Sequence, residues 1–270
     1  MTIVEKGRGI PVVLVPGIQG RWEYFRPTVD ALAESYRVMT FSLCDEPGES
    51  RASGDRPGFD DFAGQVEAAL DDRGLARAVI CGISFGGLVA LRFAAQHPER
   101  TTALILASTP GPGWHLRRTH RTFVRVPWLC APLFLAGAPG RLRKEIAMAI
   151  PETRERGAFT RGLIRLLFQA PLSPSRMAAR ARLIDGVDNA ADCARISAPT
   201  LLLTGEPALD HVVVPPSTDN YSQLISGSRA ATLERTGHLG CVTRPRAFAT
   251  IIDDFLVDAR LARRSSQDAA

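Results

Sequence analysis

Ser84 lies at the centre of the segment best suited to chemistry, the pentapeptide Gly82-Ile83-Ser84-Phe85-Gly86. The apolar run at residues 78–81 is typical of a buried strand, and the pattern at residues 88–95 is typical of a helix. A sharp strand-to-helix turn displays a serine hydroxyl, and glycines two residues before and after the serine leave space for the turn. The context therefore predicts that Ser84 is a nucleophile.

A serine hydroxyl is a weak nucleophile and needs a base, usually a histidine whose second nitrogen is held by a carboxylate. Of the five histidines, His238 is preferred because glycines flank it in a loop between the last predicted strand and the closing helix. The acid is expected in the loop that follows residues 200–204. Asp210 is the first choice and Glu206 the alternative, since either carboxylate can reach an imidazole from this loop.

Backbone N–H groups are expected to hold the negative charge that develops on a substrate oxygen. Phe85 begins the helix after the turn, so its N–H and the helix dipole both favour an anion there. The loop after residues 12–15 contains Gly17, which permits close approach and leaves Ile18 as the second predicted donor. Gln19 and Trp22 follow in the same loop and are predicted to contact the substrate.

The elements that must position these residues alternate between strand and helix, which predicts an α/β fold with a mostly parallel sheet covered on both faces. Strands are expected at residues 12–15, 37–43, 78–81, 102–107, 200–204 and 229–233. Helices are expected at residues 25–34, 59–72, 88–95 and 245–261. The sheet would thus carry Ser84, the acid loop and His238 at its carboxyl edge.

The alternation stops after residue 108, where helical patterns interrupted by prolines continue to about residue 198. This predicts a core at residues 1–109 and 198–270, with a helical cap, or lid, inserted at residues 110–197. Prolines and glycines at 110–113 and 139–140 are interpreted as hinges or as loop punctuation. The polar tail at 263–268 is expected to be disordered.

Charge does not indicate a nucleic-acid partner. The chain has 33 Lys and Arg against 28 Asp and Glu, and residues 111–196 alone hold 15 basic against 6 acidic side chains. The basic residues form no long run and no aromatic-rich strand, so this excess is interpreted as a solvated face of the insertion.

The first residues lack the pattern of a secretory signal, and no stretch is apolar enough to span a membrane. The five cysteines are scattered, without metal-ligand spacing, as expected for reduced thiols: Cys44, Cys81, Cys130, Cys193 and Cys241. The sequence therefore predicts a soluble, cytoplasmic protein that acts on a small molecule. Serine chemistry needs no metal, nucleotide or organic cofactor, and none is expected.

From residue 12 to about residue 261 the chain resembles the α/β-hydrolase superfamily. The resemblance rests on the Pro16-Gly17 loop, the turn at residues 45–50, the glycine-flanked Ser84 and the loops that hold Asp210 and His238. It implies a capped hydrolase with a Ser84, Asp210 and His238 triad. Two features depart from the usual pattern, because the acid loop is about two residues longer and Pro-Gly replaces a frequent His-Gly.

A serine-dependent, carboxylesterase-like enzyme that cleaves small or medium esters through an acyl-enzyme on Ser84 is the expected function. Cap arginines such as Arg117, Arg118 and Arg121 raise the alternative of a carboxylated substrate, as for an enol-lactone, carbon–carbon bond or acyl-thioester hydrolase. A cofactor-free perhydrolase or haloperoxidase is a further alternative on the same site. The alternative outside enzymes is a ligand-binding protein on a hydrolase scaffold.

Overall fold

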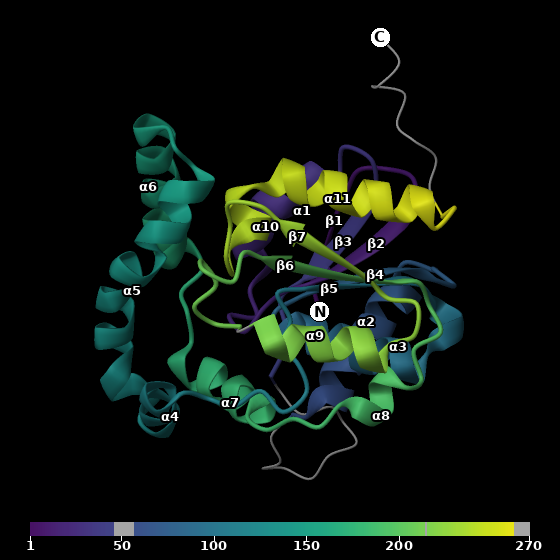
Figure 1. Cartoon of the computed structure of the whole chain (residues 1–270), viewed down its shortest axis with the longest axis horizontal. Coiled ribbons are helices and arrows are strands. Elements are labelled where there is room, and N and C mark those ends of the chain that lie inside the picture. Colours follow the sequence, from purple (N-terminus) through teal and green to yellow (C-terminus); the bar gives the residue numbers. More distant parts are fainter. Residues whose placement is uncertain (46–56, 214, 262–270) are drawn as a thin grey trace.

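The computed structural model describes residues 1–45, 57–213 and 215–261, and within them seven strands form one sheet in the order β1-β3-β2-β4-β5-β6-β7 (Figure 1). All neighbouring strands are parallel except β1 and β3. The strands are β1 (Ile3–Lys6), β2 (Pro11–Val15), β3 (Arg37–Phe41), β4 (Ala78–Ile83), β5 (Thr101–Ala107), β6 (Thr200–Gly205) and β7 (Arg229–Leu233). The predicted α/β fold with a mostly parallel sheet is confirmed.

The central strands are apolar throughout because helices cover both of their faces. In β2, Val13 and Val15 point into one core cluster, while Val12 and Leu14 point into the other. Successive side chains of a strand alternate between the two faces of the sheet, so one short apolar run supplies both cores.

Helices lie on the two faces of this sheet (Figure 1). One layer consists of α1 (Arg26–Leu32) and α11 (Pro245–Asp258), preceded in the chain by the short η1 (Trp22–Phe25) and α10 (Gly240–Thr243) respectively. The other contains α2 (Phe59–Asp72), α3 (Phe85–Gln96) and α9 (Pro215–Leu224). Apolar side chains at helical spacing, such as Phe248, Ile252 and Phe255 of α11, face the sheet and fix each helix there.

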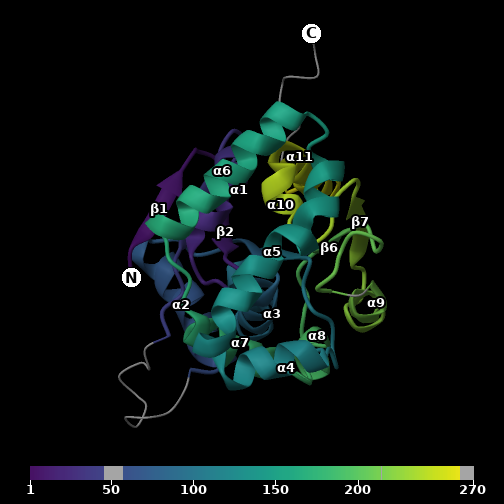
Figure 2. The same ribbon diagram turned by 90° about the vertical axis from the view of Figure 1, so that its left-hand side faces the viewer.

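A group of helices lies between β5 and β6 in the chain and beside the sheet in space (Figures 1 and 2). We call α4 to α8 the inserted helices: α4 (Arg118–Arg125), α5 (Pro127–Ala149), α6 (Thr153–Gln169), α7 (Pro174–Ile184) and α8 (Ala190–Cys193). Helix α5 contacts α10, and α6 contacts η1. The inserted helices therefore touch the elements that follow β2 and β7, at the carboxyl edge of the sheet.

Residues 139–140 are not loop punctuation, because they lie inside α5. A proline inside a helix removes one hydrogen bond and kinks or breaks the helix, so a proline alone does not fix where a helix ends. Residues 110–113 do lie in a loop, between β5 and α4. The interpretation of 139–140 as loop punctuation was therefore wrong, and that of 110–113 as a loop is consistent with the structure; a hinge at either place stays a prediction.

Among the elements that sequence analysis missed are the antiparallel edge strand β1 and helix α9. Most of the turn at 45–50 and the tail at 263–268 fall outside the described residues. Within the described residues, no helix has the length and apolar character needed to cross a membrane.

Candidate active site

The turn between β4 and α3 holds Ser84 in a strained conformation, with φ of 55° and ψ of −117°. The neighbouring positions must be glycine because there is no room for a side chain. A Cβ on Gly82 would lie 2.2 Å from the carbonyl oxygen of Gly86, and a Cβ on Gly86 would lie 2.3 Å from that of Val15. The sequence of this turn therefore fits a bend that only glycines on both sides permit.

His238 lies in the loop between β7 and α10, and its imidazole faces the Ser84 hydroxyl. The Nε2 atom of His238 is 3.1 Å from Oγ of Ser84, within hydrogen-bonding distance. Gly237 lets this loop approach the acid loop closely, because a Cβ there would lie 2.4 Å from the Leu209 carbonyl oxygen. The candidate base is thus held within hydrogen-bonding distance of the serine that the β4 turn displays.

Asp210, in the loop after β6, faces the other side of the same imidazole. Its Oδ2 lies 3.4 Å from Nδ1 of His238, while its Oδ1 accepts hydrogen bonds from the N–H groups of Val212 and Val213 at 2.8 Å. Burial raises the pKa of Asp210, but the bond and charge of His238 and the two N–H donors outweigh burial and hold that pKa below its usual value. Asp210 is therefore a fixed, ionised carboxylate.

Glu206, the alternative acid, makes a different contact. Its Oε1 accepts a hydrogen bond from the backbone N–H of Arg235 at 2.6 Å, and its own N–H donates to the Thr236 carbonyl at 2.7 Å. Glu206 thus ties the acid loop to the loop that leads to His238. Asp210, and not Glu206, therefore lies beside the imidazole.

Phe85 and Ile18 lie on the two segments that border Ser84. Phe85 is the first residue of α3, where N–H groups have no acceptor within the helix, and its ring is buried against Phe59 and Phe62. Ile18 lies in the loop between β2 and η1, inside a turn in which the Gly20 N–H donates to the Gly17 carbonyl at 2.8 Å, and a Cβ on Gly17 would lie 3.4 Å from the Ile83 carbonyl oxygen of β4. Both backbone segments are therefore held close to the carboxyl end of β4.

Gln19 and Trp22 are both half-buried and belong to the loop and helix that follow β2. The Gln19 side chain folds back over Gly17, where an added Cβ would lie 3.2 Å from Gln19 Oε1. Trp22 opens η1, and the Arg26 guanidinium lies 5.3 Å from the centre of its ring. A contact of either residue with a substrate stays a prediction.

Comparison with known proteins identifies the family. Residues 12–251 match the model of the alpha/beta hydrolase family. The chain belongs to that family. It is similar to a Klebsiella pneumoniae protein named as a carbamate hydrolase, with 29% identity over 92% of each chain. It is also similar to the 2-hydroxy-6-oxo-2,4-heptadienoate hydrolase of Pseudomonas putida, with 26% identity over 93% of this chain and 91% of the other.

Solved structures show the same fold. The enol-lactonase of Burkholderia xenovorans superposes with a TM-score of 0.76 at 22% identity, covering 95% of this chain and 96% of the other. Together with the family match, these relatives support a hydrolase of the alpha/beta family.

Arg180, which sequence analysis missed, connects the inserted helices of this alpha/beta hydrolase to the candidate oxyanion loop. Its guanidinium bonds both Asp45 carboxylate oxygens, at 2.9 and 2.5 Å, and donates from Nη1 to the Ile18 carbonyl at 2.8 Å. Burial lowers the pKa of Arg180, and the Asp45 carboxylate opposes that effect. No sequence signal separates Arg180 from the other arginines of the insertion, because its partners are more than 130 residues away.

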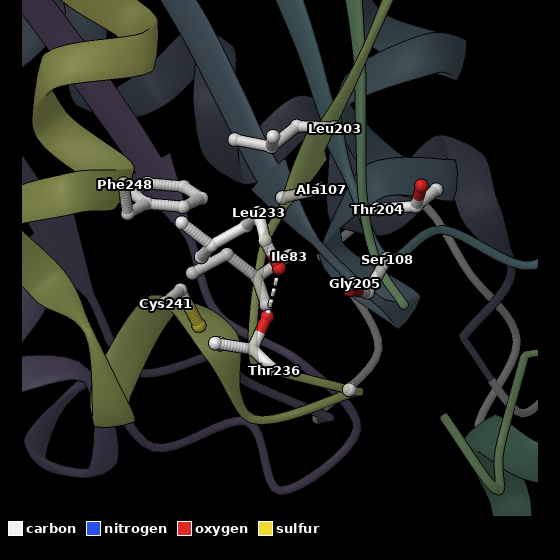
Figure 3. A pocket seen from close by; sticks show the side chains of 12 residues that line it. Ile83, Ala107, Ser108, Leu203, Thr204, Gly205, Leu233, Thr236, Cys241 and Phe248 are labelled. Atoms are coloured by element: carbon white, nitrogen blue, oxygen red, sulfur yellow. Dashed lines mark hydrogen bonds between the residues drawn. The ribbon is translucent and has the colours of Figure 1, made fainter. Parts of the chain in front are cut away.

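A small pocket lies behind the His238 loop, between the ends of several strands (Figure 3). Ile83, Gly205 and Gly237 line it, and the Thr236 hydroxyl donates to the Leu233 carbonyl at 2.6 Å across it. The lining includes the neighbours of Ser84 and His238 but neither of those two residues. This pocket therefore adjoins the candidate site, and the side chains of Ser84 and His238 do not line it.

Proposed function

We propose that this alpha/beta hydrolase is a serine-dependent enzyme that cleaves small or medium carboxylic esters. His238 takes the proton of the Ser84 hydroxyl while Ser84 Oγ attacks the carbonyl carbon of the ester. The N–H groups of Phe85 and Ile18 donate to the oxyanion that forms. Asp210 orients the imidazole and stabilises its protonated form.

The observation that carries the proposal is the position of one imidazole between a hydroxyl and a carboxylate. His238 lies 3.1 Å from Ser84 Oγ and 3.4 Å from Asp210 Oδ2. Such distances suit proton transfer in a site without substrate, where these bonds are often longer than in the reacting complex. The strained turn at Ser84 supports the same role.

Two half-reactions complete the proposed cycle. His238 first gives its proton to the departing alcohol, which leaves an ester between the acyl group and Ser84 Oγ. It then takes a proton from water, whose oxygen attacks the acyl carbon. Collapse of this second intermediate releases the carboxylic acid, returns the proton to Ser84 and requires no other reactant.

The inserted helices are proposed to act as a cap over this site. The Tyr24 hydroxyl donates to the Ala170 carbonyl at 2.9 Å, and Nε1 of Trp114 donates to the Val212 carbonyl at 3.2 Å. These bonds join the insertion to η1 and to the acid loop. A cap fixed there limits the access of water, which strengthens the electrostatic interactions of the site.

A substrate that bears a carboxylate is the second candidate, because the Pseudomonas putida relative is named for an oxo-dienoate and a fold neighbour for an enol lactone. Arg117, Arg118 and Arg121 are exposed on the insertion, and Arg121 lies 3.9 Å from the Asp185 carboxylate. These contacts give no specific support to a carboxylate site at the three arginines, so simple esters remain the first choice.

Hydrolysis of p-nitrophenyl esters from acetate to decanoate tests the proposal. Ser84→Ala and Asp210→Asn are expected to lower kcat by about 10³-fold or more, while Glu206→Gln, the matched carboxylate control, changes it by less than about tenfold. A fluorophosphonate should label the wild type on Ser84 and leave Ser84→Ala unlabelled. A wild type that remains unlabelled and turns over no ester would contradict the proposed function.

A further inference from the structure

The last turns of α5 bind both loops that carry the candidate acid and base. Lys144 donates to the Ala208 carbonyl in the acid loop at 3.5 Å, and Arg235 donates from Nε to the Met148 carbonyl at 3.1 Å. Figure 2 shows α5 crossing in front of the sheet toward α10. An inserted helix therefore reaches the segments on both sides of His238.

Glu145 makes the central contact of this helix. Its side chain projects from α5 and is buried, with 2% of the residue exposed. One carboxylate oxygen, Oε1, accepts hydrogen bonds from the N–H groups of Gly237 at 2.8 Å and Leu239 at 2.6 Å. These are the two residues that flank His238, so a single carboxylate fixes the backbone on both sides of the imidazole.

Burying a carboxylate at this place costs free energy of folding unless its hydrogen bonds compensate for the lost solvation. Burial raises the pKa of Glu145, and the N–H donors of Leu239 and Gly237 together with the charge of His238 counteract part of that effect. The other ionisable groups facing Glu145 are Asp210, whose charge raises that pKa further, and the Cys241 thiol. An apolar side chain would be easier to bury, so packing alone does not account for a glutamate.

We propose that Glu145 is a positioning residue through which the inserted helices hold His238 in its working place. The inference rests on the proposed function of the Ser84 site. Glu145 fixes the two peptide groups around His238 and places a negative charge near the imidazolium that forms when Ser84 gives up its proton.

The consequence is that the position of α5 controls the reactivity of Ser84. When α5 lies against the His238 loop, the imidazole is held 3.1 Å from the Ser84 hydroxyl. When α5 moves away, Gly237 and Leu239 lose their shared acceptor and the imidazole loses its fixed position. A displacement of about 1 Å in a positioned group can cost about 10²-fold in rate. The reactivity of Ser84 therefore depends on the contact between α5 and the His238 loop.

Two substitutions separate the roles of geometry and charge. Glu145→Gln retains an oxygen that accepts from Gly237 and Leu239 but removes the charge, whereas Glu145→Ala removes both. Glu155→Gln, on the exposed surface of α6, is the matched control. The measurements are kcat and KM for a p-nitrophenyl ester, and the rate of Ser84 labelling by a fluorophosphonate, between about pH 5 and 9.

We expect kcat and the labelling rate to fall about tenfold in Glu145→Gln and about a hundredfold in Glu145→Ala, with KM changed by less than about threefold. The control should match the wild type. The ratio of wild type to Glu145→Gln should fall as pH falls, because the pKa of wild-type Glu145 is raised by burial and its carboxylate loses the same charge toward acid pH. A purely structural role would leave that ratio independent of pH.

Rates within about twofold of the wild type in both variants, or a ratio that does not change with pH, would overturn the inference. If Glu145→Ala does not fold, Glu145→Gln decides alone. If the wild type neither hydrolyses esters nor reacts with the phosphonate, the proposed function fails first. The NMR signal of the imidazole proton shared by His238 and Asp210 then tests the positioning: a signal unchanged in Glu145→Gln refutes it, and a shifted or lost signal supports it.

Discussion

Replacing Arg180 with methionine tests whether the inserted helices are anchored to the core by one buried ion pair. The substitution keeps a long apolar stem but removes the guanidinium. In the wild type that group bonds both oxygens of Asp45, at 2.9 and 2.5 Å, and the Ile18 carbonyl at 2.8 Å. The side chain of Arg180 is 2% exposed and that of Asp45 is 11% exposed, so neither charge is well solvated.

The loss in the free energy of unfolding follows from the Asp45 carboxylate that remains. Removing one partner of a buried ion pair costs about 3 to 5 kcal/mol, because the other charge stays without compensation. Arg176, 3.6 Å from the same carboxylate, supplies part of that compensation, so we expect about 3 kcal/mol. The lost bond to the Ile18 carbonyl should also slow phosphonate labelling of Ser84 about tenfold.

Urea unfolding of the wild type, Arg180→Met and Arg176→Met measures this difference directly, provided the slope of each transition is the same. Arg176 is the matched control, because it lies one turn earlier on α7 and its side chain is 54% exposed. Replacing Arg176 should lower the free energy of unfolding by less than about 1 kcal/mol. The double variant Arg180→Met with Asp45→Asn should regain part of the loss. Equal costs for Arg180→Met and Arg176→Met would refute the reasoning.

Three further predictions concern the same region. Gly86→Ala should abolish phosphonate labelling and lower the melting temperature, because its Cβ would lie 2.3 Å from the Val15 carbonyl oxygen; normal labelling would contradict this. The pKa of Asp210 is lowered in the folded protein, so its ionised form adds stability that is present above about pH 4 and lost as pH falls. The unfolding free energies of the wild type and Asp210→Asn should therefore converge in acid. Burial raises the pKa of the Cys241 thiol to about 12, whereas Cys44 is exposed. A disulfide reagent at neutral pH should therefore modify Cys44 and reach Cys241 only after unfolding. Mass spectrometry of the peptides measures which cysteine is modified.

The sequence predicts the parts of this molecule whose physical cause is local. The turn around Ser84 needs glycines at fixed distances from the serine, and the covered strands need unbroken apolar runs, so short stretches of sequence reveal both. The order of the elements then brings the loops of Asp210 and His238 to one edge of the sheet. The choice between Asp210 and Glu206 needed coordinates, because both carboxylates lie in the same loop.

Contacts made by single side chains across the fold left no such pattern. Arg180 and Glu145 are ordinary charged residues in a basic helical segment, and their function as anchors depends on partners far away in the chain. Strand β1 is short and lies at the edge, with a partly exposed pattern that resembles a loop. The interpretation of residues 139–140 as loop punctuation was wrong because α5 continues through its proline, and proline alone does not fix where a helix ends.

The two unpredicted anchors belong to one arrangement. Arg180 reaches from α7 to the carbonyl of Ile18, on the side of Ser84 where the oxyanion is expected. Glu145 reaches from α5 to the peptide groups around His238, on the side where the base lies. Both side chains are buried charges that an independent lid would not need, since a lid that only excludes water can close on apolar contacts. Because each anchor holds backbone rather than substrate, the inserted helices help to assemble the site. Loss of either anchor should therefore lower kcat more than it raises KM.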